Sequence, residues 1–381
     1  MYSTFLILFY GCIIISFILL KISTSRSNSE RNFLRLPFIL SIIIITLFGG
    51  LREYVGRDFQ TYLELYDSLS LDDFGLGNRF KIEYSYFLLV QLCRILDLGV
   101  EGFFVLSAFI TILLLYNLFR NQKDLLPYAI LLFFFSYPYA FVINGVRQAI
   151  SIFAFLNGAK YLDADNKSKH RFFKFILWLL IGSSFHSFSL ILIFLYWLFN
   201  NSIIRNCSSV VLSSILLSGV AFNVLNLASV IVNVLSSSPL AAYILFISYM
   251  NDDRFTMQVG GIGLASVITI VFYVIIFSQY KKIASLYPQY RVYFVLMAIG
   301  AALYYMFPGN MLMERVAYYF LFSEIVVIPL FIKSSYQYHS SVFKLISIII
   351  IVWFVCLFHI DLPSLFENQM NPMSTIMGIN I

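Results

Sequence analysis

The chain has 381 residues, of which 60% are hydrophobic and only 12% are charged, and its formal net charge is +6. Apolar runs of membrane-spanning length exclude an ordinary soluble domain and predict a polytopic, all-α integral membrane protein. The positive charge does not indicate nucleic-acid binding, because the basic residues are spread over many short loops, as the positive-inside rule describes. The four cysteines stand singly in apolar segments, which excludes a disulfide framework or a zinc site.

The first apolar run, 5–20, is interpreted as a retained membrane span. No basic residue precedes it, whereas four follow it, which is not the pattern of a cleaved signal peptide. Further apolar runs recur along the whole chain, and the clearest are 38–48, 103–115, 259–277 and 345–358.

Loop charges predict about 12 transmembrane helices with both termini outside. The loops assigned to the cytoplasm hold 17 Lys and Arg residues and four acidic ones, whereas the segment 51–83 holds four basic and seven acidic residues. The assigned loops are 21–35, 120–126, 160–174, 200–208, 279–291 and 333–344. The whole chain, 1–381, is therefore expected to form a single transmembrane domain.

The segment 84–98 is expected to lie on or dip into the outer membrane face. It is short and interrupted by Arg94 and Asp97, and a full crossing there would break the alternation of loop charges downstream. The first outer loop is accordingly assigned to 51–101, with an interfacial helix, and a second outer loop to 229–259.

Charged residues are unusually dense at the start of the first outer loop, at Arg52, Glu53, Arg57 and Asp58. Charge beside lipid costs several kcal/mol unless it faces water or a charged ligand, so this stretch is predicted to line a polar site. The alternative is that the two arginines anchor the chain at the interface by snorkelling or ion pairing.

Asp58, Tyr62 and Tyr66 follow one another at intervals of four and would share one face of a short helix. A carboxylate beside tyrosine rings suits a sugar, whose C–H faces pack on aromatic rings while its hydroxyls bond to acids. The alternative for Asp58 is a plain helix N-cap.

Arg147 is a candidate phosphate-binding residue. Asn144 is expected to cap a new helix with Arg147 in its first turn, which would aim a guanidinium and free backbone N–H groups at one point. The alternative is an arginine that snorkels to the interface. Gln148 is a weaker candidate beside it.

His186 lies in the turn GSSFHSFS between two apolar runs, and the topology puts this turn at the outer surface. A neutral imidazole there can accept a proton from a substrate hydroxyl, and a charged one can hold pyrophosphate. The alternative is a histidine bonded to neighbouring serines that closes a helix hairpin.

Arg315 begins another span from the outer side, directly after Glu314. It is a second candidate for binding an anionic substrate, and the alternative is a local ion pair with that glutamate or with a neighbouring acid. Glu324, deeper in the same apolar run, must be paired, protonated or in contact with water, and is interpreted as structural.

Four stretches in this order resemble the EpsG-like branch of the Wzy-type polysaccharide polymerases, the O-antigen or capsule repeat-unit polymerases. They are GLREYVGRDFQTYLELY, VINGVRQAISIFAFLNGAKYL, SSFHSFSLILI and RVAYYF. The resemblance covers nearly the whole chain and implies a GT-C-like or Wzy/ligase-like helical bundle in the bacterial cytoplasmic (inner) membrane, with its active site facing the periplasm or the outside.

The resemblance implies a membrane glycosyltransferase that joins undecaprenyl-pyrophosphate-linked repeat units, a donor and an acceptor, beside membrane lipid. It carries over the site candidates Arg57, Asp58, Arg147, His186 and Arg315, with Arg52 and Gln148 as weaker ones. A separate chain-length regulator is a further expected partner.

Because undecaprenyl pyrophosphate is already a good leaving group, arginines can stabilise its charge, and no metal or other cofactor is expected. His186 or Asp58 would serve as the base. An O-antigen ligase, a membrane acyltransferase and a flippase for lipid-linked sugars are the alternative functions.

Overall fold

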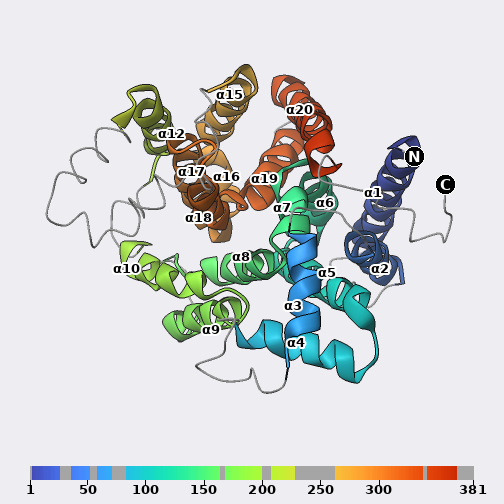
Figure 1. Ribbon diagram of the computed structural model, residues 1–381. Helices are drawn as coiled ribbons and strands as arrows, with labels where there is room; N and C mark the ends of the chain where they lie inside the picture. The colour runs from blue at the N-terminus through green and yellow to red at the C-terminus, as the bar shows by residue number, and fades with distance from the viewer. Residues whose placement is uncertain are drawn as a thin grey trace, which may run out of the picture. The chain divides into compact units, whose positions relative to one another are not determined.

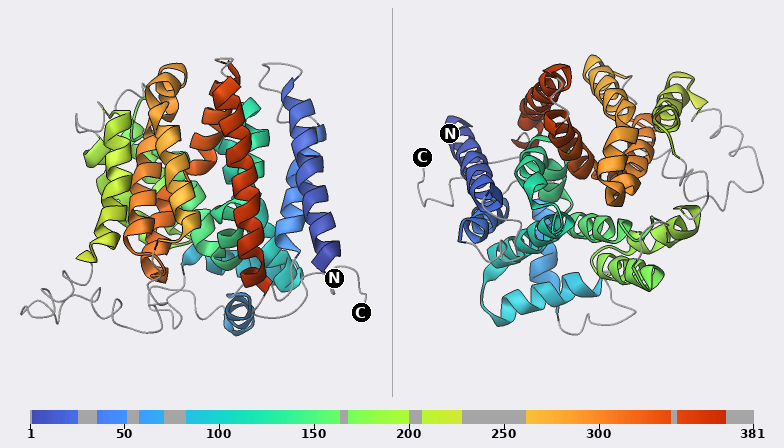
Figure 2. Two further views of the ribbon diagram at one scale, coloured as in Figure 1. Left: turned by 90° about the horizontal axis from the view of Figure 1, so that it is seen from above. Right: turned by 180° about the vertical axis from the view of Figure 1, so that it is seen from behind.

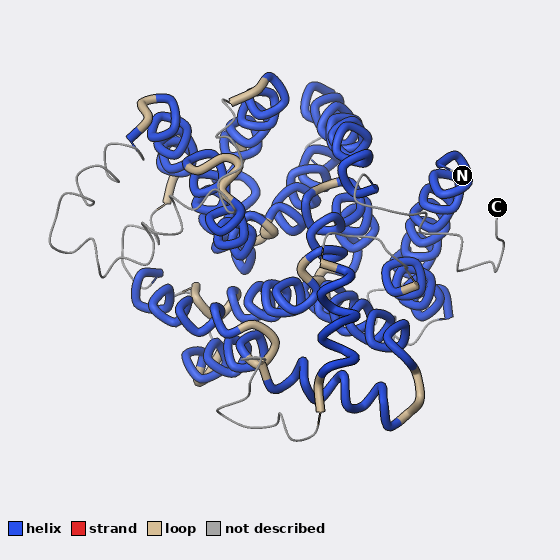
Figure 3. The backbone as a smooth tube through the Cα atoms, in the orientation of Figure 1, coloured by secondary structure: helices blue, strands red, loops and turns tan. Residues whose placement is uncertain are grey.

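The computed structural model describes residues 2–25, 36–51, 58–70, 83–163, 168–199, 207–227, 262–337 and 341–366. Within these ranges the chain forms helices and connecting turns and contains no strand (Figure 3). The expected all-α fold class is therefore confirmed for the described residues. The arginines predicted at positions 52 and 57, and the second outer loop at 229–259, lie outside them.

The chain forms two compact units, whose helices are labelled in Figure 1. Unit 1 comprises Met1–Tyr161, Ser168–Tyr196 and Ser340–Ile381, and unit 2 comprises Leu162–Lys167 and Trp197–His339.

The elements of unit 1 are α1 (Tyr2–Ser25), α2 (Leu36–Gly50), α3 (Phe59–Ser68), α4 (Tyr84–Ile95), α5 (Gly99–Leu118), η3 (Lys123–Leu125), α6 (Leu126–Phe135), α7 (Tyr137–Asn144), α8 (Val146–Ala159), α9 (Arg171–Ser183), η4 (Ser187–Phe194) and α20 (Ser341–Phe366). The short helix α10 (Leu195–Phe199) follows η4. Those of unit 2 are α12 (Ser209–Val224), α15 (Leu264–Ser278), α16 (Tyr280–Leu286), η6 (Pro288–Tyr290), α17 (Arg291–Met306), α18 (Met311–Leu321) and α19 (Glu324–Gln337).

Three helices of the described chain are long and apolar enough to cross a membrane: Leu6–Thr24 within α1, Gly99–Leu118, and Ser341–Ile360 within α20. The number rises to as many as six if each pair of helices joined at a sharp bend is one span. The expected 12 crossings are therefore not confirmed, although the apolar helices are those of a membrane protein.

The helices of unit 1 pack in an order that follows the sequence. α1 packs on α2, α2 on α5, α5 on α8 and α8 on α9, while α20 returns to α6. Aromatic packing also joins α20 to α1, because the fully buried ring of Phe9 in α1 stacks on Phe358 of α20 with centroids 4.6 Å apart. Tyr10 and His359, the next residues on each helix, are hydrogen-bonded to each other.

Two short helices of unit 1 differ in direction from its long ones. In the left view of Figure 2, α3 (blue) is seen end-on, whereas α1 and α20 run along the page. α4, predicted from 84–98, has 12 residues, or about 18 Å at 1.5 Å per residue, far less than the roughly 30 Å of a bilayer core. It is too short to cross, and its location at the outer interface stays a prediction.

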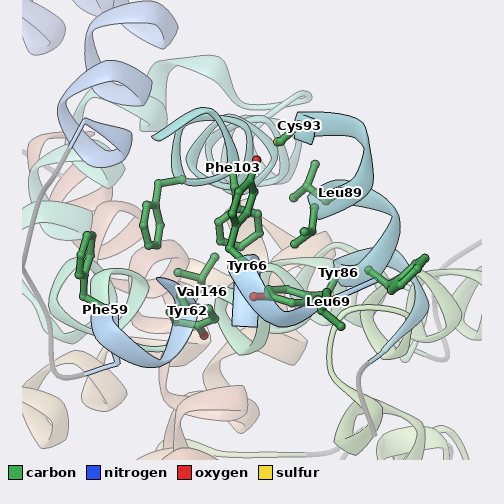
Figure 4. Packing of buried hydrophobic residues seen from close by; sticks show 12 residues of the cluster. Phe59, Tyr62, Tyr66, Leu69, Tyr86, Leu89, Cys93, Phe103 and Val146 are labelled. Atoms are coloured by element: carbon green, nitrogen blue, oxygen red, sulfur yellow. The ribbon is translucent and has the colours of Figure 1, made fainter. Parts of the chain in front are cut away.

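An aromatic cluster holds α3 against α4 and α5 (Figure 4). Tyr62 lies between Tyr86 of α4 and Phe103 of α5, with ring centroids 6.1 and 6.2 Å away. The guanidinium of Arg94 donates to the carbonyls of Tyr66 and Leu69 and lies over the Tyr66 ring. Because the last carbonyls of a helix have no partner within it, Arg94 completes the C-terminal end of α3.

In unit 2, small residues allow helix backbones to approach closely. A Cβ atom at Gly219 of α12 would overlap the backbone of Ala302 in α17, as expected for closely packed membrane helices. Glu324, wholly buried at the start of α19, accepts a 2.7 Å hydrogen bond from the Tyr273 hydroxyl. This pairing agrees with the structural interpretation of Glu324.

Candidate functional site

A break between two helices positions Arg147. α7 ends at Asn144 and α8 begins at Val146, so Arg147 lies in the first turn of α8, as expected. The predicted cap is wrong: Gly145 is the N-cap, and the Asn144 side chain donates back to the carbonyl of Ala140 in α7. A Cβ atom at Gly145 would lie 2.8 Å from the Phe141 ring, so a larger residue at the break would require that ring to shift.

Three side chains surround the Arg147 guanidinium: those of Tyr62 in α3, Tyr86 in α4 and Glu83, the residue before α4. Nη1 donates to Oε2 of Glu83 at 2.8 Å, and Cζ lies 5.2 Å from the centroid of the Tyr86 ring. The guanidinium and the backbone N–H of Arg147 also hydrogen-bond to the Tyr62 hydroxyl. The ion pair is only partly covered, with 28% of the Arg147 side chain and 16% of the Glu83 side chain exposed. Arg147 is thus fixed in place and still accessible.

Tyr62 supports this arginine with its hydroxyl group, while its ring is packed. Burial raises the pKa of Tyr62, and the charge of Arg147 opposes that rise only in part, so the hydroxyl stays protonated at neutral pH. Because Tyr62 and Tyr66 are both buried in the aromatic cluster, neither ring forms an open platform for a sugar. The contact with substrate predicted for Tyr62 stays a prediction.

Asp58 occupies the N-cap position of α3, as the alternative interpretation expected. Its carbonyl accepts the backbone N–H of Tyr62 at 3.0 Å, but its carboxylate forms no capping hydrogen bond. The charges of Asp58 and Arg147 both act on the Tyr62 hydroxyl. The Asp58 carboxylate and the Arg147 guanidinium are therefore both near the Tyr62 hydroxyl, and a shared catalytic site stays a prediction.

The turn with His186 is joined to α4 and α8 by hydrogen bonds of its backbone. The backbone N–H of His186 donates to the carbonyl of Gly182 at 3.0 Å, which closes the end of α9. The carbonyl of His186 accepts from the Ser151 hydroxyl of α8 at 3.4 Å. Ser85 of α4 binds Ser184 twice, through its backbone N–H at 2.9 Å and its hydroxyl at 2.7 Å.

Glu83 connects Arg147 to the turn that contains His186, and sequence reasoning missed it. Its Oε2 accepts from Arg147, and its Oε1 accepts from the backbone N–H of Ser187, the residue after His186, at 3.2 Å. In the sequence Glu83 is one of seven acidic residues in a loop. No local pattern marks it, because its partners lie 64 and 104 positions away.

The remaining candidates are placed differently. Gln148 is buried within unit 1. Arg315 lies in α18 of unit 2, whose first turn is closed by Asn310, which accepts the N–H of Met313, and by Glu314, which accepts the N–H of Gly309. That Arg315 acts together with Arg147 stays a prediction. In the described parts of the chain, no group of three or more His, Cys, Asp or Glu side chains is arranged to hold a metal ion.

The fold and the site define a class: a helical membrane protein in which an arginine, a glutamate and a histidine turn from distant segments meet at one point. The model of the EpsG family matches residues 35–375, nearly the whole chain, so the protein belongs to the EpsG family. This is a family of Wzy-like polysaccharide polymerases, as the sequence resemblance indicated. No curated protein and no solved structure matches the chain.

Proposed function

We propose that this protein polymerises undecaprenyl-pyrophosphate-linked oligosaccharide repeat units at the extracytoplasmic face of the bacterial inner membrane. Family membership supports polysaccharide polymerisation in general. The observation that carries the proposal is that Arg147, partly exposed, is fixed by Tyr62 and Glu83 beside the turn of His186. A fixed guanidinium fork matches the oxygens of a diphosphate.

The proposed reaction is a direct glycosyl transfer. The hydroxyl oxygen of the acceptor sugar bonds to the anomeric carbon of the donor, and the bond from that carbon to the diphosphate oxygen breaks. The electron pair of the broken bond leaves with undecaprenyl pyrophosphate, and the hydroxyl proton passes to a base.

Arg147 stabilises the negative charge on the departing diphosphate. Arg315, Arg57 and Arg52 are further candidates for this work, and Gln148 is a weaker one. His186 and Asp58 are the candidates for the base, because both side chains can accept a proton. The hydrogen bond from Ser151 of α8 to the His186 carbonyl and the effect of the Asp58 charge on Tyr62 support this choice. Arginine donors suffice for this scheme, so it includes no metal ion.

Replacing Arg147 tests the proposal. Arg147→Ala should lower chain extension at least about a hundredfold, the usual cost of losing a donor that stabilises developing charge. The measurement is the length of polymer formed from synthetic lipid-linked repeats by purified protein in detergent, where no transport step is needed.

The matched control is Arg171→Ala, which removes an arginine that lies over the Tyr196 ring, away from this site. The control should form polymer of normal length. Normal polymer from Arg147→Ala would remove Arg147 from the mechanism. In cells, loss of a polymerase leaves single repeat units attached to the final acceptor, whereas loss of a ligase leaves none.

A further inference from the structure

The carboxylate of Glu83 occupies a position made of anion-binding groups. One oxygen accepts from the Arg147 guanidinium at 2.8 Å and the other from the backbone N–H of Ser187 at 3.2 Å. The two donors thus hold two oxygens that are bonded to a single atom. A phosphoryl group presents oxygens in the same way, and guanidinium and backbone N–H groups are its usual ligands in proteins.

The ion pair can open without unfolding its surroundings. Both side chains keep contact with solvent, and an ion pair at a partly exposed position is a weak interaction. The Tyr62 hydroxyl and the Tyr86 ring hold Arg147 independently of Glu83. Removal of the carboxylate would therefore leave the guanidinium in place.

Resting on the proposed function, we infer that Glu83 is an exchangeable counter-ion, which occupies the anion site of Arg147 and Ser187 in the substrate-free protein and is displaced by the incoming diphosphate. A diphosphate carries more negative charge than one carboxylate and therefore competes for the arginine. Glu83 thus regulates access to the site. It keeps Arg147 neutralised until a sufficiently charged ligand arrives.

Glu83→Gln isolates the effect of the charge. The amide oxygen of glutamine can still accept from Arg147 or from Ser187, but no negative charge then competes with the ligand. Inorganic pyrophosphate and farnesyl pyrophosphate should each bind purified Glu83→Gln protein about three- to fivefold more tightly than wild type, a gain expected from removing one weak ion pair. Isothermal titration calorimetry in detergent measures both affinities.

The matched control is Glu64→Gln. Glu64 is exposed on the neighbouring helix α3, where it accepts from Gln60 at 3.2 Å. The same substitution there should leave both affinities within about twofold of wild type, since an exposed charge is screened by solvent.

Each outcome decides the inference. Tighter binding of both probes supports it, and tighter binding of farnesyl pyrophosphate alone supports it with a lipid headgroup as the ligand. Unchanged or weaker binding of both probes overturns it, because Glu83 would then support the site and not compete for it.

A third variant separates this inference from the proposed function. If Arg147→Gln binds pyrophosphate as tightly as wild type, Arg147 does not hold the anion, and both ideas fail. If Glu83→Gln binds more tightly but the wild-type protein does not extend lipid-linked repeats, the proposed function fails and the counter-ion inference stands.

Wild-type protein provides a second measurement if Glu83→Gln does not fold. A displaced carboxylate is more open to attack by a water-soluble carbodiimide. The modification of Glu83, mapped by mass spectrometry, should therefore increase on addition of inorganic pyrophosphate. An unchanged or lower yield would overturn the inference.

Discussion

At the scale of single residues, the contacts of Arg147 stabilise it by about as much as its position at the start of a helix destabilises it. A cation in the first turn of a helix opposes the helix dipole by about 0.3–1 kcal/mol. A partly exposed ion pair contributes about 0–1 kcal/mol, and a cation near an aromatic ring about 0.5–2 kcal/mol. The contacts with Glu83 and Tyr86 therefore hold the guanidinium without fixing it permanently, which suits a group that must exchange one anion for another.

Tyr62 provides a residue-scale prediction. Tyr62→Phe keeps the packed ring but removes the hydroxyl that bonds to the Arg147 guanidinium and backbone. The free energy of unfolding should fall by about 1–3 kcal/mol, as for a lost hydrogen bond to a charged group. Chain extension should fall about tenfold because the guanidinium is less well placed. Thermal unfolding in detergent and the polymerisation assay measure the two effects.

The matched control for this variant is Tyr66→Phe. Tyr66 is buried in the same aromatic cluster one turn further along α3, and its ring lies over Arg94. This variant should keep wild-type chain extension. Equal losses from the two variants would show that the Tyr62 hydroxyl has no special link to Arg147.

At the scale of elements, two short crosswise helices determine where the site forms. α4 begins directly after Glu83, and its first turn binds the turn before His186 through Ser85. α3 brings Tyr62 to the start of α8 and is itself held on α4 by Arg94. The site thus lies where the ends of α3, α4, α8 and α9 meet.

Glycine contacts between helices give an element-scale prediction. Gly219→Ala places a methyl group against the backbone of Ala302, and backbone cannot give way as a flexible side chain can. The free energy of unfolding should fall by about 1–3 kcal/mol, the usual cost of overpacking. Thermal unfolding of the purified protein in detergent measures this change.

Gly11→Ala is the control for that prediction. Gly11 lies inside α1, and among the described residues no atom outside the adjoining residues and the nearby α1 backbone lies within 4 Å of a Cβ placed there. Since alanine favours the helix over glycine by about 0.5–1 kcal/mol, this variant should be as stable as wild type or slightly more so. A loss of stability equal to that of Gly219→Ala would contradict the close approach of α12 and α17.

At the scale of the whole molecule, basic residues lie at both ends of α8, the helix that runs from Val146 to Ala159. Arg147 begins α8 beside the residues of the predicted outer segments, and Lys160 follows its last residue. Burial and the neighbouring charges of Arg120 and Lys174 lower the pKa of Lys160. Basic residues from two loops assigned to the cytoplasm therefore lie near one another, and the side of the membrane on which they lie stays a prediction.

Labelling of introduced cysteines tests this topology. In a variant without the four native cysteines, Asp67→Cys on α3 should react with a membrane-impermeant maleimide in intact cells. Lys169→Cys, in the turn before α9, should react only after the cells are permeabilised. Both positions are exposed, so access depends on the side of the membrane. The reverse pattern would place the candidate site in the cytoplasm and contradict the proposed function.

Much of this protein follows from its sequence alone. Composition and apolar runs predict an all-helical membrane protein, because a bilayer requires backbone groups to be satisfied within each span. Short motifs indicate the EpsG family, and the helix start expected after Asn144 already places Arg147 in the first turn of a helix, although the cap is Gly145. These features depend on neighbouring residues, and so a linear sequence reveals them.

Only the tertiary structure decides which charges meet. The sequence suggested Asn144 as the cap of α8, but its side chain bonds within α7, and nothing distinguished Glu83 from the other acidic residues of its loop. It suggested open tyrosine rings, but packing against α4 and α5 covers them and leaves the Tyr62 hydroxyl to Arg147. Helix periodicity states which face is apolar, but partners 64 and 104 positions apart are chosen by how the helices pack in three dimensions.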